Sequence, residues 1–248
     1  MPEPADAQVL VRAGRPALGG IGTLARVDTD AAAPEAYLGA LGASGLTAYV
    51  GLFDVAGLLD GDVVWVSAAA GSVGSLVAQM AKLRGSRVIG SAESAAKVSY
   101  LLDELGLDPP STTPPARSWS CCAPAAPERI DLYFDNVGGE HLEAAIAALR
   151  RRGRVALCGA ISEYDARKPG PGPSSLLLAI ANDLTLRGFR GSSHVERIDD
   201  MARDVGAWLR EGRIRYRQTG VDGLERAPEA LVRLLAGETT GKTLVRIA

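Results

Sequence analysis

The chain has 248 residues, which is enough for one large domain or for a nucleotide-binding domain with a smaller partner. Hydrophobic residues make up 47% of it and charged residues 23%, and the formal net charge of -2 argues against nucleic acid or an anionic membrane surface as a partner. The N-terminus lacks a positive region followed by an apolar stretch, and no segment is long and apolar enough to span a membrane, so we expect a cytoplasmic location.

The first 40 residues contain one short strand candidate, at residues 8–12, followed by a glycine-rich stretch at residues 13–22. This part of the chain holds too few apolar residues to form a core of its own. We therefore expect it to depend on the remainder of the chain for its structure.

Residues 62–92 have the order strand, glycine turn, helix, strand. The run Val63–Val66 is apolar without alternation, as in a parallel strand that is buried on both faces. Residues 76–85 then follow helical spacing and end at Gly85, and residues 86–92 form the second strand. This order predicts a βαβ unit.

Strands and helices continue to alternate after this unit. We expect a helix over residues 95–106, a strand and turn over 130–139, a helix over 141–153 and a strand over 154–162. The alternation predicts the fold class α/β, with a doubly wound, mostly parallel sheet of the Rossmann type.

Gly71 and Gly74 stand at the junction between the first strand of the unit and its helix. Glycine lets the backbone turn tightly and approach a pyrophosphate, and the helix N-terminus offers unpaired N–H groups there. The glycine spacing alone is a weak signal. Because it lies between a strand and a helix and before a second strand, it favours a nucleotide site over a purely structural turn.

The end of the second strand indicates which dinucleotide binds. A pocket for NAD places Asp or Glu there to accept hydrogen bonds from the ribose hydroxyls, but this strand ends in Gly90, Ser91 and Ala92. Lys97 follows at the start of the next helix, where a cation can pair with a 2′-phosphate. The pattern favours NADP(H), although an ordinary solvated helix lysine explains Lys97 equally well.

No metal site is expected. Cys121, Cys122 and Cys158 show none of the spaced pairing of a disulfide framework or of a structural zinc site. The chain has only His141 and His194 to complete a ligand set, so a catalytic zinc is not expected either.

Six strings within residues 38–248 resemble successive blocks of one family, in family order. They are LGASGLTAYVGL, VSAAAGSVGSLVAQMAK, KVSYLLDELG, IDLYFDNVGGE, CGAISEYD and GKTLVRI. The family is the leukotriene B4 dehydrogenase, prostaglandin reductase and alkenal double-bond reductase group of the zinc-independent medium-chain dehydrogenase/reductase superfamily. FDNVGG together with CGAIS-x-Y is specific to that group within the superfamily.

The resemblance implies a homodimeric enzyme that reduces the C=C bond of enals and enones with hydride from NADPH. Tyr164 would hydrogen-bond the substrate or intermediate; from the residues alone, a surface tyrosine beside a charged loop is the simpler interpretation. The residues that would contact the cofactor are Thr47, Ala70, Gly71, Ser72, Val73, Gly74, Lys97, Asn136, Val137, Cys158, Gly159, Ala160, Ile161, Ser162 and Phe189. The alternatives are a quinone reductase and an NADP(H)-binding remnant with little or no catalytic activity.

The chain departs from the family before its LG-x-LG block. The family holds a complete GroES-like barrel there, whereas this chain has 37 residues. We expect residues 1–40 to be a remnant of that substrate domain, residues 41–215 to form the Rossmann NADP-binding domain, and residues 216–248 to return to the substrate domain. In addition, Ala43 and Ser44 replace the family's Met-Pro, and Thr240 replaces an Asn.

Residues 109–127 contain six prolines and occupy the place of the third strand and helix of the sheet. A surface loop is one interpretation. The other interpretation is a shifted reading frame. In that frame each codon consists of the third base of one codon of the given frame and the first two bases of the next, starting at Pro109. With codons that end in G or C, this frame spells AVDH and then VELLRA, which resembles the family's strand and helix. We therefore interpret residues 109–124 as the product of a compensated reading-frame shift.

Overall fold

The computed structural model describes residues 9–11, 24–109, 129–164, 170 and 172–247. The strand expected near residues 8–12 is β1 (Val9–Val11), which pairs antiparallel with β2 (Leu24–Arg26). The proline-rich segment, with Cys121, Cys122 and the interpretation as a reading-frame shift, lies outside the described residues. Within the described residues, every helix is too short or too polar to cross a membrane.

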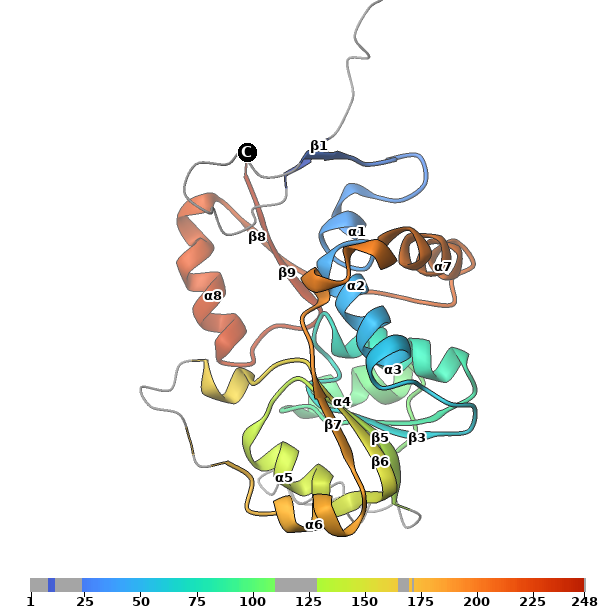
Figure 1. The fold of residues 1–248 in the computed structure, drawn as a ribbon. Helices are drawn as coiled ribbons and strands as arrows, with labels where there is room; N and C mark the ends of the chain where they lie inside the picture. Colours follow the sequence, from blue (N-terminus) through green and yellow to red (C-terminus); the bar gives the residue numbers. More distant parts are fainter. Residues whose placement is uncertain (1–8, 12–23, 110–128, 165–169, 171, 248) are drawn as a thin grey trace, which may run out of the picture.

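A five-stranded parallel sheet forms the centre of the molecule (Figure 1). Its strand order is β4-β3-β5-β6-β7, and each neighbouring pair is parallel. The chain moves outward from β3 to β4 and then crosses to β5 on the other side, so the order reverses between β3 and β5. In open α/β sheets, ligands bind in the crevice that such a reversal opens at the carboxyl ends of the strands. The strands are β3 (Val63–Val66), β4 (Arg87–Gly90), β5 (Ile130–Asp135), β6 (Leu149–Leu157) and β7 (Thr185–Gly188).

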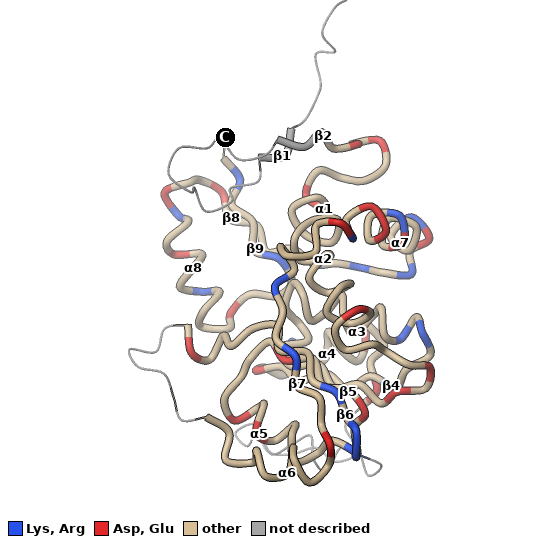
Figure 2. The backbone as a smooth tube through the Cα atoms, in the orientation of Figure 1, with Lys and Arg blue, Asp and Glu red and all other residues tan. Residues whose placement is uncertain are grey.

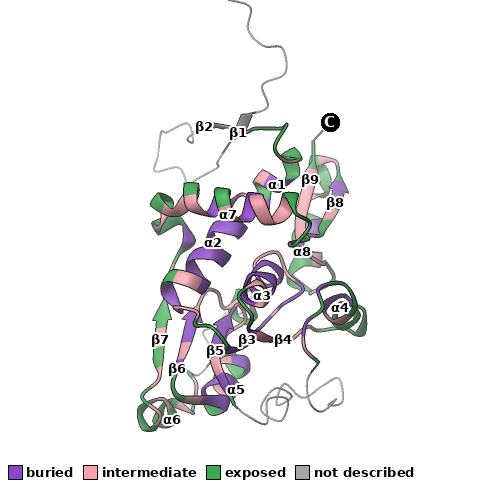
Figure 3. Ribbon diagram, turned by 90° about the vertical axis from the view of Figure 1, so that its right-hand side faces the viewer, coloured by how far each residue is buried: buried purple, intermediate pink, exposed green. Residues whose placement is uncertain are grey.

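Helices cover both faces of this sheet, which confirms the expected α/β fold class (Figures 1 and 3). One face carries α2 (Ala43–Val50), which continues into the π-helical turn η1 (Gly51–Val55), with α3 (Gly74–Leu83), α4 (Ala95–Ser99), η2 (Tyr100–Glu104) and α7 (Ile198–Arg210). The other face carries α5 (Gly139–Ala148), with α6 (Leu176–Ala181) beside it. Because both faces are covered, the apolar run Val63–Val66 is buried along its whole length.

The helix expected over residues 141–153 ends early, and this part of the prediction is wrong. Leu149 already belongs to β6, where it is fully buried and pairs with Ile130. The register then shifts, and Arg152 has a φ of 61°, a left-handed conformation that no α-helix contains. The strand expected over residues 154–162 likewise ends at Leu157, so Cys158 and the residues after it form a loop at the carboxyl edge of the sheet.

The C-terminal segment returns to the carboxyl edge of the sheet. It forms a parallel pair of strands, β8 (Gln218–Asp222) and β9 (Lys242–Arg246), with α8 (Ala227–Leu235) between them. Gly241 N donates a 2.8 Å hydrogen bond to the carbonyl oxygen of Ala70, in the turn before α3. Just before β8, the Gln79 side chain of α3 bonds both backbone polar groups of Arg215. The short helix α1 (Pro34–Leu38) precedes α2.

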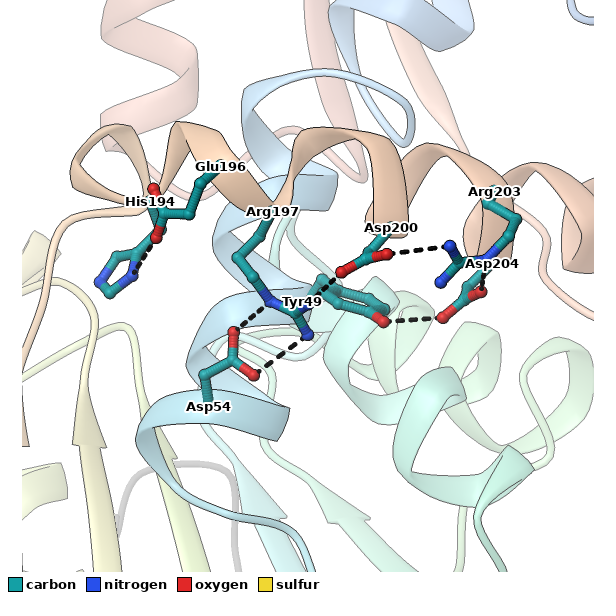
Figure 4. Close-up of polar contacts among 8 residues, drawn as sticks. All are labelled: Tyr49, Asp54, His194, Glu196, Arg197, Asp200, Arg203 and Asp204. Atoms are coloured by element: carbon teal, nitrogen blue, oxygen red, sulfur yellow. Dashed lines mark hydrogen bonds and ion pairs between the residues drawn. The ribbon is translucent and has the colours of Figure 1, made fainter.

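Arg197 joins α7 to α2 and η1 (Figure 4). Its guanidinium lies 5.4 Å from the ring centre of Tyr49, and its Nε lies 2.9 Å from Asp54 Oδ2. The Tyr49 hydroxyl donates to Asp204 at 2.7 Å. Burial, and to a smaller extent this hydrogen bond, raises the pKa of Tyr49 to about 12. Acidic and basic residues alternate along α7 in Figure 2. Ion pairs this exposed contribute little to the stability of the protein.

His141 is the buried histidine of the face covered by α5. It is 5% exposed and stacks on Trp65, with 6.1 Å between the ring centres. Burial lowers its pKa to about 4, against an opposing effect of Glu93. The folded protein therefore keeps His141 neutral at pH values where an unfolded chain binds a proton.

We predict that the free energy of unfolding falls as pH drops from about 6.5 to about 4, because protons then favour the unfolded chain. The loss attributable to His141 is on the order of 3 kcal/mol, at about 1.36 kcal/mol for each pKa unit. His141→Phe keeps an aromatic ring on Trp65 but cannot titrate, so urea unfolding across this range should show a shallower loss. His194→Gln, at a histidine whose side chain is 26% exposed, serves as the control. An equally steep loss in His141→Phe and in the wild type would contradict the prediction.

Candidate functional site

The chain requires glycine at the first position of α3, directly after the turn that follows β3. A Cβ on Gly74 would lie 2.4 Å from the carbonyl oxygen of Ala68 and 2.9 Å from Ala69 Cα. Ala68 itself has a φ of 46°, so the chain turns sharply as it leaves the strand. At the start of α3, Ser75 N donates to the carbonyl oxygen of Gly71 at 3.0 Å and Leu76 N to that of Val73 at 3.1 Å, so this turn caps the helix at the carboxyl edge of the sheet. Ala70, Gly71, Ser72 and Val73, from the predicted set, all lie in this turn.

A second turn, at the end of β5, is built around the carboxyl group of Asp135. Asp135 is 1% exposed, and its Oδ1 accepts hydrogen bonds from Val137 N at 3.0 Å and Gly138 N at 2.9 Å. The hydroxyls of Tyr133 and Ser67 donate to the same oxygen at 2.9 and 3.4 Å. Burial raises the pKa of Asp135, although these bonds oppose the shift. Asp135 was not predicted from the sequence. An acidic residue at the end of a buried strand was the feature that could have identified it.

The ends of β3 and β5 are joined through Ser67 and Asn136. Asn136 N donates to Ser67 Oγ at 2.9 Å, and its side-chain Nδ2 donates to the Ser67 carbonyl oxygen at 2.7 Å. The predicted cofactor residue Asn136 thus also holds two strand ends together.

The loop after β6 is bonded to the Asp135 turn along its length. Cys158 N and Gly159 N both donate to the carbonyl oxygen of Asp135, at 2.9 and 3.0 Å. Farther along, Ile161 N donates to Asn136 O, and Ser162 donates to Val137 O through its N and its Oγ. Residues 158–162 of the predicted set therefore lie beside Asn136 and Val137. Burial raises the pKa of Cys158 to about 12, so its thiol stays protonated.

A cavity of about 680 Å³ opens at this edge of the sheet. It is enclosed by the chain that follows β3, β4 and β5, the start of α5, residues 161–163, the end of α8, and Gly170, Gly172, Pro173 and Gly237. Val137, Ile161 and Ser162 of the predicted set line it directly. Four carboxylates also line it: Glu93, Glu140, Glu143 and Glu163. Its volume is in the range of cofactor and ligand sites.

Lys97 lies at the rim of the cavity and is 8% exposed. It is therefore not the solvated helix lysine that the sequence alone also allowed. Its Nζ lies 2.7 Å from Glu93 Oε2 and 2.7 Å from the carbonyl oxygen of Gly237, and both partners line the cavity. Sequence reasoning did not identify Glu93, although an acid four residues before a helix lysine was a usable signal.

Thr47 and Phe189 lie where α2 and η1 meet the chain after β7, since a Cβ on Gly51 would lie 2.4 Å from the Phe189 ring. The Phe189 ring packs edge-to-face on Phe134 with 6.2 Å between ring centres. Gly191, two residues after Phe189, approaches α2 so closely that a Cβ would lie 2.3 Å from Thr47 Oγ1. Thr47 Oγ1 in turn donates to the carbonyl oxygen of Ala43 at 2.8 Å.

Tyr164 is 66% exposed, and its hydroxyl lies 3.1 Å from the position that a Cβ on Gly159 would take. The side chain is therefore at the surface and also against the loop that follows β6. Ala160 completes that loop and lies against Gly138, whose Cβ position is 3.1 Å from Ala160 Cβ. Among the described residues, no group of three or more His, Cys, Asp or Glu side chains could hold a metal ion.

Residues 72–207 match the family model described as zinc-binding dehydrogenase. The chain is 44% identical over 214 residues to prostaglandin reductase 1 of Bos taurus, covering 84% of this chain and 64% of the relative. It is 38% identical over 220 residues to the NADPH-dependent curcumin reductase of Escherichia coli (strain K12), covering 87% of this chain and 64% of the relative. The chain thus spans just under two thirds of the length of these two relatives.

Among solved structures, the crystal structure of CurA from Vibrio vulnificus in complex with NADPH matches with a TM-score of 0.84 at 36% identity. The match covers 92% of this chain and 70% of that one. The likeness therefore extends over nearly the whole of the present chain.

We predict that Gly191→Ala destabilises the protein by about 1–3 kcal/mol, because the added methyl group overpacks the contact with Thr47. Gly188→Ala is the matched control, since a Cβ there has nothing within 4 Å. Thermal unfolding of the two variants measures the difference. A wild-type midpoint for Gly191→Ala would mean that α2 does not approach the chain after β7 this closely.

Proposed function

Because the chain belongs to the zinc-independent medium-chain dehydrogenase/reductase family, we propose that it is an NADPH-dependent reductase of the C=C bond in α,β-unsaturated aldehydes and ketones. The observation that carries the proposal is the cavity at the switch point of the sheet, which is lined by Ala68 after β3 and by Val137 and Gly138 of the Asp135 turn. Relatives whose names state NADPH-dependent or prostaglandin reduction support the reaction class.

Residues beside the cavity fit NADP(H). Gly74 lets α3 begin directly against Ala68 and Ala69 at the end of β3, since any side chain there would meet their backbone, and this close packing brings the first turn of α3 to the edge where a pyrophosphate would lie. Gly90 ends β4 without an acid, and a Cβ there would lie 2.8 Å from Ala69 Cβ, so the packing excludes a larger residue. Lys97 supplies a cation at the rim for the 2′-phosphate.

The remaining assignments place the nicotinamide half at the other end of the crevice. Asn136 and Val137 flank it, residues 158–162 run beside its ribose, and Thr47 and Phe189 form the end of the pocket. When bound, NADPH supplies the hydride that is added to the β-carbon of the substrate. The hydroxyl of Tyr164 donates a hydrogen bond to the carbonyl oxygen, on which negative charge develops as the enolate forms.

Short strand pairs near the two ends of the chain bear on the substrate domain. We propose that β1–β2 and β8–β9 are what this chain has of the family's GroES-like substrate domain, on either side of a Rossmann domain over residues 41–215. Gly241, at the start of β9, is bonded to the glycine turn, so this part reaches the cofactor crevice directly.

We predict that the chain oxidises NADPH in the presence of a simple alkenal, and that Tyr164→Phe lowers kcat/KM on the order of 10²-fold, as expected for loss of one oxyanion donor. Tyr37→Phe, which loses a hydroxyl bonded to the Asp28 carbonyl in the N-terminal part, is the control. NADPH binding without any turnover would replace the proposal with the cofactor-binding remnant. Turnover with quinones but not with alkenals would replace it with the quinone reductase.

The exposed edge of the sheet supports a homodimer. Strand β7 is at the edge of the described sheet, and the adjacent helix α6 exposes Leu177 by 74% and Ile180 by 75% (Figure 3). An unpaired strand edge beside an apolar patch is a ready surface for a second copy. We propose that two chains pair across β7 and α6.

Sedimentation tests the dimer. We predict that the wild type sediments as a dimer and that Leu177→Glu with Ile180→Glu converts it to a monomer, because two charges would then be buried between the copies. Leu231→Glu with Val232→Glu places the same charges on exposed positions of α8 and should leave the dimer intact. A wild type that is monomeric, or a dimer that both variants disrupt equally, would count against this interface.

A further inference from the structure

Glu93 follows the end of β4 and lies between Lys97 and the C-terminal segment. Its Oε2 accepts from Lys97 Nζ at 2.7 Å, and its side chain is 45% exposed and lines the cavity. The carboxyl carbon lies 3.3 Å from the position that a Cβ on Gly237 would take. Gly237 has a φ of 71° and also accepts from Lys97 through its carbonyl oxygen. The Glu93 carboxylate therefore lies against both the Lys97 ammonium and Gly237 at the rim of the cavity.

The ammonium of Lys97 has three donors, of which Glu93 and Gly237 use two. An anionic group that approaches Lys97 from the cavity meets the negative charge of Glu93 beside it. A like charge at such short range opposes binding of a phosphate, whereas it does not oppose a neutral ribose hydroxyl. A carboxylate at this end of the second strand is also able to accept a hydrogen bond from that hydroxyl.

Resting on the proposed NADP(H) site, we propose that Glu93 determines cofactor specificity by competing with the 2′-phosphate for Lys97 and accepting from the ribose hydroxyl of NADH. Lys97 favours NADPH and Glu93 weakens that preference. Together the two residues set the ratio of the dissociation constants of NADH and NADPH. Glu93 acts on binding of the adenosine half, whereas Tyr164 is assigned to the reacting carbons.

The experiment measures dissociation constants of NADPH and NADH by the fluorescence of the bound nicotinamide, in the wild type and in Glu93→Gln. Glutamine keeps the shape of the side chain and removes its charge. The ratio of the NADH constant to the NADPH constant should rise about tenfold, the scale of one charge-assisted hydrogen bond. Lys97→Ala should instead bring the ratio below one, because Glu93 then opposes the 2′-phosphate with no cation beside it. Far-UV circular dichroism verifies that each variant is folded.

Two further measurements separate the local pairing from a general effect of charge. Glu140→Gln removes the same charge from the lining of the same cavity but has no ion pair with Lys97, so its ratio should match the wild type. Adenosine 2′,5′-bisphosphate and adenosine 5′-monophosphate carry the adenosine half with and without the 2′-phosphate. Titrated calorimetrically, their dissociation constants should show the same rise in ratio on Glu93→Gln.

An unchanged ratio in Glu93→Gln, or an equal rise in Glu140→Gln, would overturn the inference and leave the proposed reductase activity in place. If the wild type binds neither dinucleotide, both the inference and the proposed function fail. Because the readout is binding, absence of turnover with enones does not affect it.

Discussion

The carboxyl edge of the sheet depends on a single buried oxygen, Oδ1 of Asp135, which accepts from two backbone N–H groups and two hydroxyls. Those bonds fix the turn after β5, and the carbonyl oxygens of that turn then bind the loop after β6. Ser67 extends the same network to β3. A buried acceptor left without these donors would cost several times what one hydrogen bond contributes, so the turn has little freedom to relax. The cavity owes its shape to this constraint.

The cavity also couples parts of the chain that are distant in sequence. Lys97 of α4 reaches Gly237 after α8, and Gly241 reaches Ala70 before α3, so the C-terminal segment closes the crevice from outside the sheet. The chain spans just under two thirds of the length of the two reductases that it was compared with.

Much of this arrangement followed from local sequence patterns. A continuous apolar run such as that of β3 needs burial on both faces, and a tight strand-to-helix turn needs glycine. The structure has both features where the sequence predicts them. The end of α5 was not predictable in the same way, because residues 149–153 have helical composition and are strand only through pairing with Ile130. The roles of Asp135 and Glu93 depend on partners brought from other strands and from the C-terminal segment, which periodicity does not encode.

We propose that the crevice at the carboxyl edge of the sheet, beside the glycine turn and the Asp135 turn, is the cofactor site. A crystal structure of the protein grown with NADPH tests this proposal. We predict the pyrophosphate against the first turn of α3, the 2′-phosphate at Lys97, and the nicotinamide between Thr47 and the loop of residues 158–162. A dinucleotide bound elsewhere on the molecule, or one whose 2′-phosphate lies away from Lys97, would contradict it.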